Sequence, residues 1–134
     1  MSKAVTAYII DDDPIFVYSL KKLIALRSYC DNVLSYPNGA DALEALQNAN
    51  QSGLLMPDIV LLDINMPVMD GWEFLNEYAK LKPTFSKPIT LFLLTSSIDD
   101  RDIKRAKAIE AVNRYITKPV TMAKLVEIFG EPLV

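Results

Sequence analysis

Polar side chains that can bind a cation or a phosphate stand at the ends of four of the five apolar runs in the sequence. They are Asp11 and Asp12 after the first run, Asp63 after the third, Thr95 after the fourth and Lys118 after the fifth. Two carboxylates about 5 Å apart repel each other by roughly 3 kcal/mol at an effective dielectric constant near 20, so three together need a counter-charge. Oxygen ligands without cysteine or histidine suit a hard cation, and Mg²⁺ fits better than Ca²⁺ because few protein ligands are available.

A carboxylate surrounded by a cation, a lysine and a hydroxyl can accept a phosphoryl group. Asp63 can act as the nucleophile and form an acyl phosphate. The metal ion and Lys118 would neutralise charge on the oxygens of the transferring group, and Thr95 would supply a hydroxyl donor. Taken alone, each of these residues is typical of a turn or a helix cap. Their coincidence at four strand ends favours the functional interpretation.

The composition excludes several classes of protein. The chain contains no histidine, which excludes Ser-His-Asp and Cys-His catalysis, histidine-ligated zinc and a phosphohistidine carrier. Its 14 basic and 17 acidic residues give a net charge of -3, whereas nucleic-acid binders typically carry a basic surface. We expect Lys104, Arg105 and Lys107 to face water or an acidic partner. The single Cys30 fits a reducing, cytoplasmic compartment, and no apolar run reaches the length of a membrane span.

The spacing of apolar residues predicts alternating strands and helices that bring the polar residues together. The predicted strands are Ala4–Ile10, Val33–Tyr36, Ile59–Leu62, Ile89–Leu94 and Arg114–Thr117. Strands joined by helices run parallel, so all of their carboxyl ends lie at one edge of the sheet. We therefore predict an α/β fold, a three-layer doubly wound sheet of five parallel strands with helices on both faces. Ligands bind such sheets at the carboxyl edge, where the strand order reverses.

Capping residues predict where the helices begin and end. The predicted helices run from Pro14 after Asp13 to near Ser28–Asp31, from Asn38 to a loop at residues 51–53, from Asp70 to Lys82, from about Ile98 to Ala111 with Ser97 and Asp100 as candidate caps, and from Thr121 to about Phe129. The fourth helix carries few apolar residues, so we expect much of it to face water.

Four segments of the sequence resemble the receiver domain of two-component response regulators. They are YIIDDDP at 8–14, IVLLDINMPVMDG at 59–71, LLTSS at 93–97 and YITKP at 115–119. The resemblance spans essentially the whole chain, and segment 59–71 is quite specific by itself. It implies the flavodoxin-like receiver fold, with five helices and strand order 2-1-3-4-5. Val120, where an aromatic residue often follows, and the glycine-free stretch Glu110–Arg114 depart from the family pattern and leave the local loop geometry open.

The resemblance also implies a ligand set. Asp63 would be the phosphoacceptor. Asp12 would bind Mg²⁺ directly and Asp11 through water, while Asp63 and the backbone carbonyl of Asn65 would complete the ligands from the protein.

The same resemblance implies a switch. Thr95 would hydrogen-bond the phosphoryl group, and Lys118 would form an ion pair with it, with the bond from Lys118 to Pro119 in the cis form. Tyr115 would turn inward when Thr95 moves. The surface made of the fourth helix, the fifth strand and the fifth helix would change as a result.

We expect a single receiver domain over residues 1–134, with no output domain in this chain, that signals by protein contact. The phosphoryl donor would be a sensor histidine kinase or a histidine phosphotransfer protein. We expect no nucleic-acid or membrane partner, and either a monomer or a phosphorylation-dependent dimer. The protein would be no enzyme beyond catalysing its own phosphorylation and dephosphorylation.

Two other functions compete with this one. A phosphatase with an aspartyl nucleophile needs a second acidic residue, two positions later, as its general acid. Asn65 occupies that position here. A receiver-like scaffold that acts without phosphorylation is the main alternative. The presence of all five pocket residues argues against a scaffold, because an inert pocket would more plausibly lack one of them.

Overall fold

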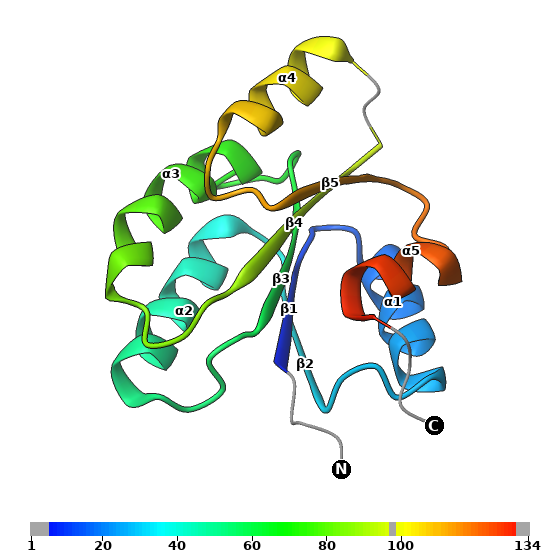
Figure 1. The fold of residues 1–134 in the computed structure, drawn as a ribbon, viewed down its shortest axis with the longest axis horizontal. Helices are drawn as coiled ribbons and strands as arrows, with labels where there is room; N and C mark the ends of the chain where they lie inside the picture. The colour runs from blue at the N-terminus through cyan, green and yellow to red at the C-terminus, as the bar shows by residue number, and fades with distance from the viewer. Residues whose placement is uncertain (1–5, 97–98, 131–134) are drawn as a thin grey trace.

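The computed structural model describes residues 6–96 and 99–130, which form a parallel sheet of order β2-β1-β3-β4-β5 with helices on both faces (Figure 1). The strands are β1 Thr6–Ile10, β2 Asn32–Tyr36, β3 Ile59–Asp63, β4 Thr90–Thr95 and β5 Arg114–Thr117. The helices are α1 Pro14–Leu26, α2 Gly39–Ser52, α3 Gly71–Leu81, α4 Asp100–Ala108 and α5 Met122–Phe129, and a short 3-10 turn covers Lys82–Thr84. The predicted fold class and strand order are confirmed.

The sheet separates two hydrophobic cores. Side chains alternate along each strand, so Tyr8 and Ile10 of β1 pack with α2 and α3, while Ala7 and Ile9 pack with α1 and α5. β1 and β3 are buried along their whole length, as expected for inner strands covered on both faces. Figure 1 shows the same division, with α2 and α3 on one side of the sheet and α1 and α5 on the other.

Local hydrogen bonds begin α1, α2, α3 and α5 where the sequence predicts them. The side chain of Asp13 accepts from two backbone N–H groups of α1, and Asn38 caps α2. Asp70 and Glu73 form a reciprocal capping box at α3, and Thr121 caps α5. These caps satisfy backbone donors that have no partner inside the helix.

Two helix ends differ from the prediction. The first helix ends at Leu26, short of Ser28, because Ser28 takes a positive φ of 51° that ends helical hydrogen bonding. The second helix continues through Ser52, so residues 51 and 52 are helical rather than loop. Gly53, with φ 76°, supplies the left-handed residue that ends it.

The fourth helix is shorter than predicted. It begins at Asp100 and ends at Ala108, and its cap is Asp99, whose side chain accepts from the N–H of Arg101. The candidate cap Ser97 and the predicted start at Ile98 lie outside the described residues. Ala106 is the one buried residue of this helix, which confirms that most of it faces water.

The longest helix in the described ranges, α2, has 14 residues, and none of the described helices is both long and apolar enough to cross a bilayer.

Candidate functional site

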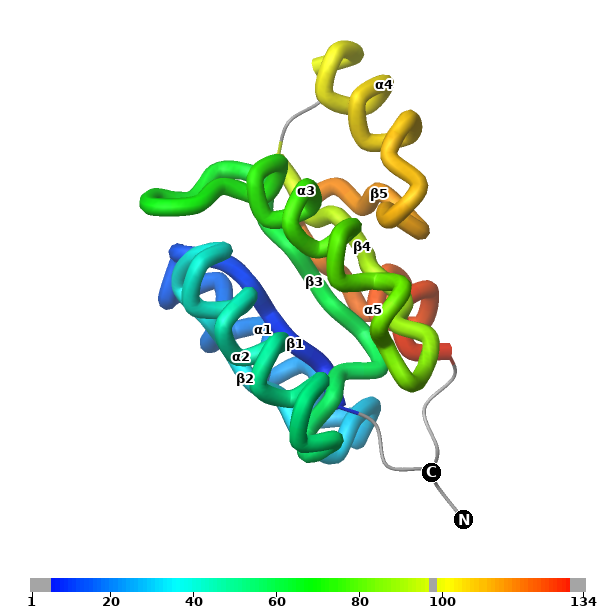
Figure 2. The backbone as a smooth tube through the Cα atoms, turned by 90° about the vertical axis from the view of Figure 1, so that its left-hand side faces the viewer, coloured from blue at the N-terminus to red at the C-terminus, as the bar shows by residue number. Residues whose placement is uncertain are grey.

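The predicted site residues meet at the carboxyl edge of the sheet. Asp63 and Thr95 end β3 and β4, Asp11 follows β1, and Lys118 follows β5. β1 pairs with β2 on one side and with β3 on the other. The chain therefore continues to opposite sides of β1, and the strand order reverses there. Figure 2 shows the end of β1 and the loop between β3 and α3 at the same edge.

Three carboxylates lie close enough to share a cation. One oxygen from each of Asp11, Asp12 and Asp63 lies within 4.8 Å of the others. Asp11 and Asp63 are buried, whereas Asp12 is exposed. An all-oxygen donor set with one side open to solvent suits Mg²⁺, which keeps several waters when it binds proteins. The role of the Asn65 carbonyl stays a prediction.

Lys118 supplies the positive charge among these carboxylates. Its Nζ donates to Asp11 Oδ2 at 2.7 Å and lies 3.4 Å from Asp63 Oδ1. It also lies 4.1 Å from the centre of the Phe16 ring, a cation–π contact. Burial alone would lower the pKa of Lys118, but the hydrogen bond to Asp11 and the charges of Asp63 and Asp11 together raise it. The lysine therefore stays charged at neutral pH.

Asp63 has an unusual affinity for a proton. Burial, and then the charge of Asp11, raise the pKa of its carboxyl from 3.8 to about 6, although Lys118 acts in the opposite direction. Around pH 7 the carboxylate is mostly ionised. An ionised carboxylate that is poorly solvated and beside a lysine is well prepared to act as a nucleophile.

The backbone near Asp63 requires a glycine at position 71. A Cβ on Gly71 would stand 2.5 Å from the Asp63 carbonyl oxygen and 2.8 Å from the Ile64 Cα, closer than real contacts allow. The N–H of Gly71 also donates to the Ile64 carbonyl at 2.7 Å. This close approach explains physically why a glycine ends segment 59–71, and it fixes the backbone that carries Asp63.

Thr95 links the pocket to β5. It is fully buried, and its side chain shares a hydrogen bond with the hydroxyl of Tyr115. Tyr115 is half-buried, and burial raises the pKa of its hydroxyl despite that hydrogen bond. The two residues of the predicted switch are therefore in contact.

Local contacts define the backbone at both departures from the family pattern. The bond from Lys118 to Pro119 is cis, as predicted, and Val120 is buried in the core beside α5. Before β5, the side chain of Asn113 accepts from the Leu91 N–H at 2.7 Å, and its own N–H donates to the Leu91 carbonyl at 2.9 Å. Asn113 thus fixes a turn that contains no glycine.

Sequence reasoning missed the contact between Phe16 and Lys118. Phe16 lies in the first turn of α1 and reads as an ordinary core residue of an amphipathic helix. Nothing in the spacing links it to a lysine near the end of the chain, because the contact depends on how α1 and β5 are placed around the sheet.

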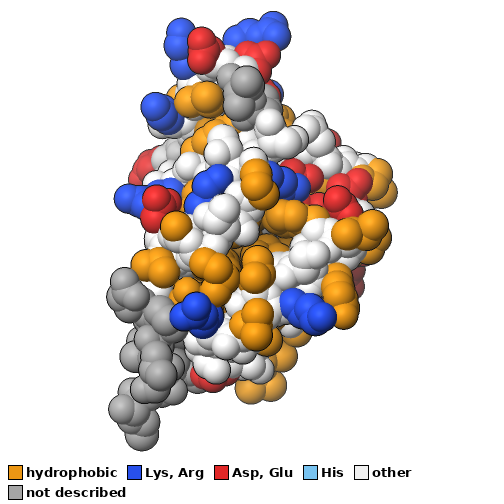
Figure 3. Space-filling view, turned by 90° about the vertical axis from the view of Figure 1, so that its right-hand side faces the viewer, with side chains coloured by type: hydrophobic (Ala, Val, Ile, Leu, Met, Phe, Trp, Pro, Cys, Tyr) orange, Lys and Arg blue, Asp and Glu red, His pale blue; other side chains and the backbone are white. Residues whose placement is uncertain are grey.

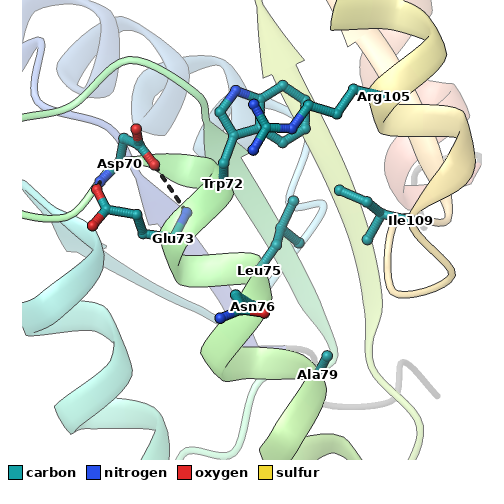
Figure 4. A pocket seen from close by; sticks show the side chains of 8 residues that line it. All are labelled: Asp70, Trp72, Glu73, Leu75, Asn76, Ala79, Arg105 and Ile109. Atoms are coloured by element: carbon teal, nitrogen blue, oxygen red, sulfur yellow. Dashed lines mark hydrogen bonds between the residues drawn. The ribbon is translucent and has the colours of Figure 1, made fainter.

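One hollow of the structure lies away from this cluster, and another lies beside it. A cavity of about 470 Å³ separates α3 from α4, where the Arg105 guanidinium lies 4.3 Å from the centre of the Trp72 ring (Figure 4). Its lining includes none of Asp11, Asp63 and Lys118. A second hollow, of about 500 Å³, lies between α1 and the end of β2 and borders Asp11 and Asp12.

Comparisons with known proteins agree with this fold. The profile of the response regulator receiver domain matches residues 7–129. The transcriptional regulatory protein PrrA of Mycobacterium leprae is 31% identical over 119 residues, 88% of this chain and 45% of PrrA. The sensor histidine kinase CheAY of Helicobacter pylori is 36% identical over 88 residues, 65% of this chain and 10% of CheAY. The chain spans less than half the length of these two relatives.

Solved structures show the same likeness. A two-component response regulator from Cytophaga hutchinsonii has a TM-score of 0.85 and 30% identity, with 96% of each chain covered. The phosphorylated cyanobacterial phytochrome response regulator RcpA has a TM-score of 0.76 and 27% identity, with 96% of this chain and 90% of RcpA covered. The chain belongs to the response regulator receiver family of two-component systems. Membership implies phosphoryl acceptance on an aspartate.

Proposed function

We propose that Asp63 accepts a phosphoryl group from a phosphohistidine on a partner protein, in a Mg²⁺-dependent reaction. The observation that carries this proposal is the placement of Lys118, whose ammonium lies 2.7 Å from Asp11 and 3.4 Å from Asp63 at the open edge of the sheet. A lysine between two buried carboxylates is in place to follow the phosphoryl oxygens once Asp63 is phosphorylated.

The transfer breaks one bond and forms another. A carboxylate oxygen of Asp63 attacks phosphorus, the P–N bond to the donor imidazole breaks, and its electron pair returns to the ring nitrogen, which leaves as neutral imidazole after taking a proton. Bound Mg²⁺, held by Asp11, Asp12 and Asp63, would neutralise charge on the transferring oxygens. Lys118 adds its charge on the same group, and Thr95 offers a hydroxyl that the phosphorylated state can recruit.

Exposed apolar side chains beside the pocket support a protein as the donor. Ile15 and Tyr18 on α1 are 77% and 64% exposed, and Tyr18 lines the hollow that borders Asp11 and Asp12. Figure 3 shows hydrophobic side chains gathered on the face that α1 and α5 form. A sensor histidine kinase or a histidine phosphotransfer protein would bury this surface when it presents its phosphohistidine.

The output would follow from the contact between Thr95 and Tyr115. Movement of Thr95 toward the phosphoryl group would draw Tyr115 with it and alter the surface of α4, β5 and α5, where a downstream protein would bind. We infer that the chain catalyses only its own phosphorylation and dephosphorylation.

Mass spectrometry of the intact protein tests the proposal. Wild type and Asp63→Asn are incubated with Mg²⁺ and a small phosphodonor such as phosphoramidate, with and without a chelator. We expect one phosphoryl group on wild type, none on Asp63→Asn, and none with the chelator. Equal labelling of the two proteins would refute the assignment of Asp63. Partner binding that is indifferent to Mg²⁺ and phosphodonor would favour the scaffold alternative.

A further inference from the structure

A second lysine binds the loop that carries Lys118. Lys124 lies in the first turn of α5 and is half-buried. Its Nζ donates to the carbonyl oxygen of Thr117 at 2.5 Å and to that of Pro119 at 3.0 Å, and lies 3.4 Å from Thr117 Oγ1. No carboxylate of the described residues lies within ion-pair distance of this ammonium, so backbone and hydroxyl oxygens are its partners.

The two carbonyl groups stand directly before and after Lys118. One ammonium therefore restrains the peptide unit Thr117–Lys118 and the peptide unit Pro119–Val120, which lie before Lys118 and one residue beyond it. The N–H of Lys118 adds a third restraint, because it donates to the Thr95 carbonyl at 2.8 Å. These three hydrogen bonds fix the position of the Lys118 Cα relative to β4 and α5.

The position of the Lys118 Cα matters because the side chain is long and its ammonium has to reach a small site. Its ammonium must reach Asp11 and Asp63 at once, and the Phe16 ring supports it along the way. A lysine on a free loop would sample many rotamers, most of which miss the pocket. Catalytic groups lose much of their effect when they are displaced by about 1 Å.

We infer that Lys124 is a positioning residue for phosphoryl transfer: its ammonium holds the segment Thr117–Pro119 so that Lys118 stands at the phosphoacceptor. This inference rests on the proposed function of Asp63. Lys124 itself touches neither of the acidic side chains that contact Lys118, so it acts through the loop alone.

Kinetics of phosphorylation test the inference. Lys124→Met keeps most of the side-chain volume and removes the donors, whereas Lys124→Arg keeps a cation that can donate. Glu127→Gln is the matched control, because Glu127 is exposed on the same helix and forms an ion pair with the exposed Arg114. Rates are measured against phosphodonor concentration at saturating Mg²⁺.

We expect the maximal rate of Lys124→Met to fall about 10-fold or more, with a much smaller change in the half-saturating donor concentration. Lys124→Arg should recover most of that loss, and Glu127→Gln should match wild type. A Lys124→Met protein that is less stable but transfers at the wild-type rate would overturn the inference, because Lys124 would then serve the fold alone.

A second readout needs neither Mg²⁺ nor phosphodonor. Amide hydrogen exchange reports whether the Lys118 N–H keeps its bond to Thr95. We expect its protection to fall about 10-fold or more in Lys124→Met, while the Leu125 amide, which donates to Thr121 within α5, keeps its protection. Unchanged protection at Lys118 would overturn the inference. A wild type that takes up no phosphoryl group would refute the proposed function instead and would leave this readout intact.

Discussion

The end of β3 and the helix α4 lie at the same edge of the molecule, but they are held very differently. All five residues of β3 are buried, and Asp63 at its end lies beside Asp11 and Lys118, with its carbonyl close against Gly71. In α4, Ala106 is the one buried residue, and the ion pair between Asp99 and Arg101 near its start faces solvent. Figures 1 and 2 both show α4 standing apart from the other helices.

The difference fits the proposed function, in which one small domain combines phosphoryl transfer with signalling. Groups that perform phosphoryl transfer need fixed positions, and the fully buried strands provide them. An element that reports the reaction must change its position for a small free energy, and a helix with little buried surface can do so. The contact between Thr95 and Tyr115 joins β4, which pairs with β3, to β5, which packs against α4.

The largest effect expected from this contrast concerns the core. Leu62→Ala removes a fully buried side chain of β3 and should lower the free energy of unfolding by about 2–5 kcal/mol. Ile103→Ala, on the half-buried side of α4, should cost about 1 kcal/mol or less. Urea unfolding of both variants gives the comparison. Equal losses would show that α4 is packed as firmly as β3.

A smaller effect concerns the charge of Asp63. Its raised pKa means that the folded state holds the proton more tightly than the unfolded state, so this group stabilises the fold at low pH and loses that contribution as the pH rises from about 4 to about 6. Asp63→Asn has no such titration. Between pH 4 and pH 7, without Mg²⁺, wild type should lose about 1–2 kcal/mol relative to the variant, less than the full shift implies because solvent reaches the carboxylate.

Chemical denaturation across this pH range measures the difference between the two proteins. Saturating Mg²⁺ should abolish it, because a bound cation stabilises the ionised carboxylate. Parallel stability curves for wild type and Asp63→Asn in the absence of Mg²⁺ would contradict the assigned environment of Asp63.

The smallest effect concerns the contact that joins α4 to α3. Arg105→Ala removes the guanidinium above the Trp72 ring and should cost about 0.5–1 kcal/mol. Trp72 is the one tryptophan of the chain, so its fluorescence should also change. Lys104→Ala, an exposed neighbour on the same helix, is the control. Identical emission spectra for Arg105→Ala and wild type would mean that the ring and the guanidinium do not stack in solution.

The sequence predicts the start of a helix well where the capping side chain bonds a backbone N–H only a few residues away. Asp13, Asn38 and Asp70 each bond a backbone N–H two or three residues away, so the local pattern is sufficient. The candidate cap Asp100 was wrong, because Asp100 is already the first residue of α4. Several polar residues stand close together there, and Asp99, which sequence reasoning passed over, makes the cap.

The candidate site follows from the sequence for a related reason. Buried parallel strands read as continuous apolar runs, and parallel strands put their carboxyl ends at one edge. The positions of Asp11, Asp63, Thr95 and Lys118 along the chain are then enough to predict that they meet. The family resemblance added the roles of Asn65 and Tyr115, and the contact between Tyr115 and Thr95 agrees with the second.

By itself, the sequence determined the alternation of strands and helices, most of their caps and the edge at which the acidic and basic residues gather. Periodicity and capping are local, so the residues that cause them stand close together in the chain. Only the tertiary structure decided that Lys118 lies 2.7 Å from a residue 107 positions away, that Phe16 and Lys124 support it, and that Asp63 holds its proton up to about pH 6. Burial and the field of neighbouring charges arise from the packing of the whole sheet, and no local pattern contains them.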